Sequence, residues 1–175
     1  TGQFAHHRHD PRDANSLSDD QILSLLRDSN GVLWIGTRGG GLNRYDPDSG
    51  RWHRYQHDAQ DPASLTSDDV TALYEDMTGA LWVGTSGGLN RFDADTASFM
   101  PFRSDPADAQ SLSRNLVTAI GQDASGTLWI GTASGGLDSL EPQEGTFSHH
   151  RHNAKDPHSL SSDTVTSMTW DASGG

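Results

Sequence analysis

The 175-residue sequence contains no cysteine and no long apolar run. Without cysteine, neither a disulfide framework nor a thiolate zinc site can form, so we expect packing to stabilise the fold. No apolar stretch reaches the roughly 18 to 20 residues of a membrane span, and residues 1–10 lack the apolar core of a signal peptide. If the protein is exported, we expect the signal outside this sequence.

Positive charge is also scarce, since the formal net charge is -12. Nucleic-acid binding needs a basic surface that releases counterions from phosphates, so nucleic acid and anionic membranes are poor partners. The sequence also lacks a G-x-S-x-G elbow, an H-E-x-x-H motif and a P-loop, and its glycine runs suit tight turns. We therefore expect no catalytic site and no cofactor.

What the sequence does contain is an internal repeat. The phrase Leu-Trp-Ile/Val-Gly-Thr occurs three times at intervals of 48 and 47 residues, around Trp34, Trp82 and Trp129. A large aromatic residue that recurs once per repeat is expected to fill the space between neighbouring units. Other markers keep the same interval: Phe4, Trp52, Phe99 and Phe147; Leu17, Leu65, Leu112 and Leu160; Asp28, Asp76, Asp123 and Asp171.

Each repeat predicts four short strands, which in the first repeat are 22–27, 32–37, 42–46 and 52–57. The Asp-Ser-Asn-Gly turn at 28–31 predicts a hairpin between the first two. Four antiparallel strands in 47 to 48 residues indicate an all-β fold, a β-propeller segment. We expect three complete blades at 16–63, 64–110 and 111–158, the last strand of a preceding blade at 1–15, and the first strand of a following blade at 159–175.

Three segments resemble two-component regulator propeller repeats: 160–165 (Leu-Ser-Ser-Asp-x-Val), 76–85 (Asp-x-x-Gly-x-Leu-Trp-Val-Gly-Thr) and 87–93 (Gly-Gly-Leu-Asn-Arg-Phe-Asp). The resemblance implies a non-catalytic, ligand-sensing module from the periplasmic part of a bacterial hybrid two-component or diguanylate cyclase receptor, with a small molecule or saccharide as ligand. The third repeat departs from the pattern at 114–116 (Arg-Asn-Leu) and 138–141 (Asp-Ser-Leu-Glu). We expect its outer half to be less regular.

Two sets of residues are candidates for ligand binding. The first recurs just before the innermost strand of each repeat and is expected to ring a central channel, where it could bind cations or sugar hydroxyls; regular repetition nevertheless favours a structural role. The second set varies between repeats, as functional loop positions on rigid scaffolds do. The first set is Asp20, Asp68, Asn115 and Asp163, and the second is Arg38, Ser86, Ser134 and Arg114.

Two histidine clusters could form metal sites, because alternate residues of a strand share a face. The pairs are His7 with His9 and His150 with His152. His7 and His150 align with the aromatic residues Tyr55 and Phe102, and neither pair has a carboxylate as third ligand. We therefore expect aromatic packing or solvated histidines and predict no metal site.

Three complete blades and two strands fall short of the roughly four blades of the smallest propellers. We therefore expect either a piece of a longer propeller or copies that associate through exposed blade edges. Two alternatives to a sensor remain. One is a lyase resembling the streptogramin-inactivating enzymes, with a buried axial histidine and magnesium, and the other is a scaffold without a ligand.

Overall fold

The computed structural model describes residues 6–142 and 144–169, so the markers Phe4 and Asp171 lie outside the described residues. The described residues form strands, turns and bends without a helix, which confirms the all-β prediction. No helix long and apolar enough to cross a membrane occurs in the part of the chain that is described.

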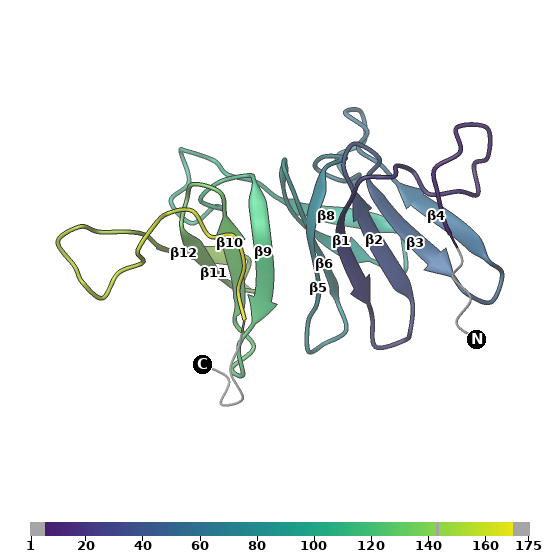
Figure 1. The fold of residues 1–175 in the computed structure, drawn as a ribbon. Helices are drawn as coiled ribbons and strands as arrows, with labels where there is room; N and C mark the ends of the chain where they lie inside the picture. The colour runs from purple at the N-terminus through teal and green to yellow at the C-terminus, as the bar shows by residue number, and fades with distance from the viewer. Residues whose placement is uncertain (1–5, 143, 170–175) are drawn as a thin grey trace.

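Twelve strands form three four-stranded antiparallel sheets, in the sequential orders β1-β2-β3-β4, β5-β6-β7-β8 and β9-β10-β11-β12 (Figure 1). This is the predicted blade topology. The strands are β1 (Ile22–Arg27), β2 (Leu33–Thr37), β3 (Leu42–Asp46), β4 (Arg51–Tyr55), β5 (Val70–Glu75), β6 (Leu81–Thr85), β7 (Gly88–Asp93), β8 (Ser98–Phe102), β9 (Val117–Gln122), β10 (Leu128–Thr132), β11 (Leu137–Glu141) and β12 (Thr146–His150).

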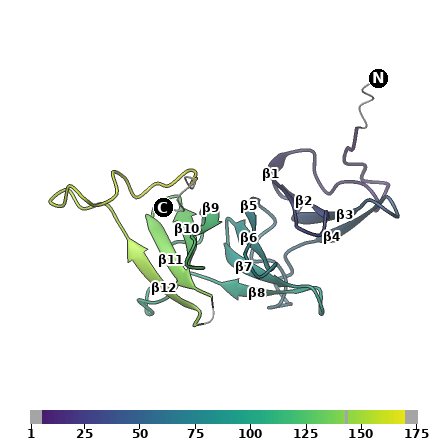
Figure 2. The same ribbon diagram turned by 90° about the horizontal axis from the view of Figure 1, so that it is seen from below.

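The hydrophobic cores lie between the sheets. One buried cluster joins Trp34 and Leu42 of the first sheet to Val70 and Val83 of the second, and another joins Trp82 to residues of the third. The inner strands β1, β5 and β9 follow one another in contact, and in the view of Figure 2 they lie on the opposite side of the fan from β4, β8 and β12. Trp34 and Trp82 therefore pack between blades, as predicted.

A glycine allows this close packing of neighbouring sheets. A Cβ added to Gly84 of β6 would lie 2.6 Å from Cγ1 of Val117 in β9, well inside contact distance. The same relation joins Gly36 to Val70 and Gly131 to Val165, at 2.5 and 2.7 Å. The glycines Gly36 and Gly84 are thus required by the inner strand of the next blade, and Gly131 by Val165 in the segment that follows the third blade.

The hairpin between β1 and β2 forms at the predicted turn. Oδ1 of Asp28 accepts the backbone N–H groups of Asn30 and Val32, and Gly31 has a φ of 83°. Oδ2 of Asp28 accepts the indole N–H of Trp34 at 2.9 Å. The turn is therefore bonded to the tryptophan that anchors the core.

The structure corrects three expectations about strands. No strand occurs among residues 6–15 and 159–169, the described parts of the segments expected to supply strands of a preceding and a following blade, and His9 forms only an isolated bridge with Leu17. The fourth strand ends at Tyr55 rather than at His57, because the His57 backbone and ring bond to the following loop. The outer half of the third blade is regular: β11 and β12 pair residue by residue from Leu137–His150 to Glu141–Thr146. The departures from the repeat pattern in this blade change side chains without disturbing the strand pairing.

Candidate functional site

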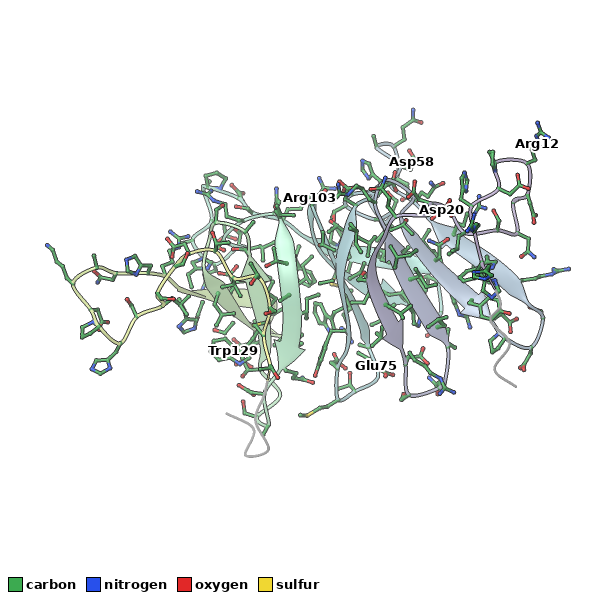
Figure 3. All side chains as sticks on the ribbon, in the orientation of Figure 1. Arg12, Asp20, Asp58, Glu75, Arg103 and Trp129 are labelled. Atoms are coloured by element: carbon green, nitrogen blue, oxygen red, sulfur yellow. The ribbon has the colours of Figure 1, made fainter. Side chains whose placement is uncertain are left out.

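One end of the molecule carries the long loops that lead from the outer strand of a blade to the next inner strand. Figure 3 shows Arg12, Asp20, Asp58 and Arg103 at this end and Glu75 toward the other. Each loop is closed by a serine whose Oγ accepts the backbone N–H of the residue six positions earlier, at 2.8 to 2.9 Å. The loops are 10–17, 58–65, 105–112 and 153–160.

The recurring polar residues before the inner strands hold these loops. Oδ1 of each residue accepts the backbone N–H of the residue eleven positions earlier, at 2.6 to 2.7 Å. Each of these side chains thus bonds to the residue directly before the preceding loop. The two positions are too far apart for a local sequence pattern to reveal the contact. The pairs are Asp20 with His9, Asp68 with His57, Asn115 with Ser104 and Asp163 with His152.

The non-repeating candidates occupy different positions. Arg38 is exposed, and Ser86 bonds through Oγ to Oγ of Ser67 at 2.8 Å. Ala133, rather than Ser134, occupies the equivalent position in the third blade, since its backbone N–H bonds to the inner-strand entry as those of Arg38 and Ser86 do. Ser134 is exposed one residue further along the turn. Arg114 lines a cavity described below.

Within each predicted pair, the two histidines contact different residues. Nδ1 of His9 lies 2.7 Å from the Leu17 carbonyl, whereas the ring of His7 packs on Tyr45 and Trp52. In the second pair, Nδ1 of His152 bonds to the Leu160 carbonyl and His150 packs on Trp129 at 5.1 Å. The aromatic positions of His7 and His150 are confirmed. No group of three or more potential metal ligands occurs among the described residues.

The third blade has a fully buried carboxylate at a position where the other two blades have an amide. Asp138 is 0% exposed and replaces Asn43 and Asn90 of the first two blades. In the first blade, Oδ1 of Asn43 accepts the backbone N–H of Ser18 and Nδ2 donates to Oγ of the same serine at 2.7 Å. A carboxylate keeps the first of these bonds and loses the second, because it has no N–H to donate.

The consequence appears at Ser113, the counterpart of Ser18. Its backbone N–H donates to Oδ2 of Asp138 at 2.8 Å, but its buried Oγ has no hydrogen-bond partner within the described chain. A buried hydroxyl without a partner costs roughly 1 to 3 kcal/mol. The third blade thus keeps an unsatisfied polar group that its neighbours avoid.

A hydrogen bond joins Asp138 to His149 on the adjacent strand. Nδ1 of His149 lies 2.7 Å from Oδ1 of Asp138, and Nε2 lies 3.0 Å from the carbonyl oxygen of Ala109. A carbonyl only accepts hydrogen bonds, so Nε2 carries a proton. The imidazole of His149 thus bridges the buried carboxylate and the loop at 105–112.

A cavity of about 450 Å³ opens beside this pair at the loop end. The buried residues Leu112 and Ser113 contribute to its inner wall, and the exposed Arg114 contributes to its rim. We call it the third-blade pocket. Its lining is Ser104, Asp105, Pro106, Asp108, Ala109, Ser111, Leu112, Ser113, Arg114, His149 and Arg151.

Sequence reasoning included Arg114 among the candidates but missed Asp138 and His149. The signal was present in the departure at 138–141, which exchanges an amide for a carboxylate. Because Asp138 and His149 are paired in the β11–β12 register, the strand assignment alone brings them side by side.

Comparison with known proteins agrees with the fold. Residues 16–39, 64–87 and 111–134 match the family described as the two component regulator propeller. The search of curated proteins returns no match. Virginiamycin B lyase from Staphylococcus aureus has 15% identity and a TM-score of 0.55 over 78% of this chain and 42% of the lyase, which is a likeness of fold alone.

Two solved extracellular domains from B. thetaiotaomicron are more similar. The domain described as that of the hybrid two component system BT3049 is 30% identical with a TM-score of 0.72, over 84% of this chain and 20% of the other. The domain described as that of the one component system BT4673 is 24% identical with a TM-score of 0.75, over 95% and 21%. The chain spans about a fifth of the length of each. With three segments matched and three blades formed, the chain contains two-component regulator propeller repeats.

Proposed function

We propose that this chain is a non-catalytic recognition module in the extracytoplasmic part of a bacterial signalling receptor, and that it binds a small ligand in the third-blade pocket. The observation that carries the proposal is the break in repeat symmetry at Asp138, His149 and Ser113. Scaffold positions repeat from blade to blade, whereas binding sites differ between them. The extracellular domains found by comparison support a location outside the cytoplasm, which we propose to be the periplasm.

The lyase alternative lacks its expected feature. That function calls for a buried histidine at the propeller axis, close to carboxylates. All nine histidines lie within the described residues, and each is exposed or half-exposed. His149, which does contact a carboxylate, lies on the outer strand β12.

A separate observation favours association through the first blade. Ile22, Leu23 and Leu25 of β1 are 45%, 36% and 64% exposed, whereas Val70, the counterpart of Ile22, is fully buried against Gly36. We propose that this apolar strand packs against a further blade, either in a longer protein or in a second copy. Light scattering of the chain and of Leu25→Glu tests the second copy: a monomer in both cases contradicts it.

The ligand proposal is tested by NMR of the amide-labelled chain against a panel of saccharides, amines, amino acids and carboxylates. We expect at least one class to shift amides of residues 104–114 and 149–151 and to leave the loops at 10–17 and 58–65 unchanged. Equal shifts in all these loops would show that the repeated scaffold binds instead. A panel without any shift in residues 104–114 would contradict the proposal.

A further inference from the structure

The first blade fills the position of the third-blade pocket with one of its own side chains. Arg54 pairs with Asn43 across β3 and β4, as His149 pairs with Asp138 across β11 and β12. Nη2 of Arg54 donates to the carbonyl oxygens of Asp13, Ser16 and Leu17 at 3.0, 2.7 and 3.2 Å. Its Nε donates to the Ser16 carbonyl at 3.0 Å. The loop at 10–17 is therefore a cradle of carbonyl oxygens for a guanidinium.

The loop at 105–112 has the same internal hydrogen bonds. Oγ of Ser111 accepts the Asp105 backbone N–H at 2.9 Å and donates to the carbonyls of Asp105 and Asp108, as Oγ of Ser16 does in the first loop with Asp10 and Asp13. The repeat thus presents Asp108, Ser111 and Leu112 where the first blade presents Asp13, Ser16 and Leu17.

Only the first blade has an arginine at this cradle, since Pro101 takes the position in the second blade and His149 in the third. The side chain of His149 is shorter than that of arginine, and of the carbonyls in this loop it bonds only to that of Ala109. The Leu112 carbonyl also loses the histidine that bonds to Leu17 and Leu65 in the other loops, because Ser104 takes that position and bonds to Ser113 instead. Two carbonyl oxygens of this loop, those of Ser111 and Leu112, are therefore left open. Among the described residues outside the strands, none donates a hydrogen bond to either of them.

We propose that the third-blade pocket binds a guanidinium group, in the position that Arg54 occupies in the first blade. The inference rests on the proposed function and names the chemical class of its ligand. A planar guanidinium carries five N–H donors and matches several carbonyl acceptors at once. Such a group satisfies the open carbonyls of Ser111 and Leu112.

Charge favours a cation over an anion in this pocket. Carbonyl oxygens carry partial negative charge, and the lining also contains Asp105 and Asp108. Arg114 and Arg151 are exposed, so solvent screens their repulsion. The formal net charge of -12 favours the approach of a cation at low ionic strength. An anion held by these two arginines is the competing outcome of the test.

The test is an NMR titration of the amide-labelled chain with methylguanidinium chloride, and with sodium acetate at equal ionic strength. We expect methylguanidinium to shift the amides of residues 108–113 with a dissociation constant on the order of millimolar, because a small fragment offers few contacts. In His149→Arg the new side chain occupies the cradle, so binding weakens at least about tenfold. The control His53→Arg adds the same charge on the exposed face of β4 and keeps the affinity of the parent chain.

A second variant works in the opposite direction. Arg54→Ala empties the first cradle, so methylguanidinium should then shift residues 13–17 as well as 108–113. This variant keeps the inference falsifiable if His149→Arg fails to fold. Agmatine and a short arginine-containing peptide, titrated in parallel, distinguish a free small molecule from the side chain of a protein partner by which of the two binds more tightly.

The outcomes separate the two proposals. Shifts by acetate and none by methylguanidinium would overturn the guanidinium inference and leave a ligand site at the pocket. Methylguanidinium binding that persists in His149→Arg would place the guanidinium elsewhere and overturn the inference. Shifts with neither ion and with no member of the ligand panel would overturn both proposals.

Discussion

The indole N–H of Trp82 donates a 2.7 Å hydrogen bond to Oδ2 of Asp76, a carboxylate that is only 7% exposed. Oδ1 of the same side chain accepts the backbone N–H groups of Thr78 and Ala80. One carboxylate thus closes the β5–β6 hairpin and fixes the orientation of the largest fully buried side chain. The other two blades repeat the bond, at 2.9 Å between Trp34 and Asp28 and 2.8 Å between Trp129 and Asp123.

Asp76→Asn should lower the free energy of unfolding by about 1 to 3 kcal/mol, because the amide can accept at the turn or at the indole but its N–H₂ cannot accept at the other. Urea unfolding measures this change. In the background of Trp82→Phe, which has no indole N–H, the same substitution should cost less. An equal cost in both backgrounds would contradict the coupling between the two residues.

Acid should destabilise the protein through Asp76. Burial opposes ionisation of Asp76, but hydrogen bonds from Thr78, Trp82 and Ala80 outweigh it and hold its pKa below 3.8. A depressed folded-state pKa stabilises the native state above the unfolded pKa of about 3.9, and this stabilisation is lost as the pH falls through the folded pKa. Unfolding free energies between pH 6 and pH 2.5 should therefore decrease below about pH 4, and less steeply in Asp76→Asn.

Gly84→Ala should destabilise the contact between the second and third blades by about 1 to 3 kcal/mol, the usual cost of overpacking. The added methyl group would lie 2.6 Å from Cγ1 of Val117. Val117→Ala removes that atom, so the double variant should recover part of the loss relative to the sum of the single variants. Thermal unfolding of the four proteins measures the recovery, and strict additivity would contradict a direct clash.

Arg54→Met should loosen the loop at 10–17, because it removes charged donors to the carbonyls of Asp13, Ser16 and Leu17. Hydrogen bonds to charged groups contribute roughly 1.5 to 3 kcal/mol. Hydrogen exchange of the Ser16 amide, which bonds to the Asp13 carbonyl, should accelerate. Arg51→Met is the control, since Arg51 is exposed on the same strand and should leave this exchange rate unchanged.

The architecture could be predicted from the sequence because each repeat contains the residue patterns of its own strands and turns. The strand intervals, the hairpin at 28–31 and the aromatic positions of His7 and His150 could all be predicted from spacing. The role of Asp20 in holding the His9 backbone could not, because the two residues are eleven positions apart across a loop. Local patterns of hydrogen bonding do not reach that far.

The candidate site was harder to predict because it depends on differences between equivalent positions. Position 138 has an aspartate where the other blades have asparagine, and position 149 has a histidine where the first blade has an arginine and the second a proline. Their effect appears only where the strand register places the two side chains against one loop, leaving Oγ of Ser113 without a partner. Comparing every repeat position by hydrogen-bonding capacity would have identified both.

The close contact at Gly84 also limits how far apart consecutive blades lie. Because the inner strand of each blade rests on the glycine of the blade before it, this contact limits the spacing between consecutive sheets and therefore the angle through which each blade is rotated. In a closed ring these angles must sum to one full turn. A methyl group added at one glycine changes a single step by a small amount, but the error is carried to the seam, where the first and last blades meet. Tolerance to such substitutions should therefore be lower in a closed propeller than in an open segment.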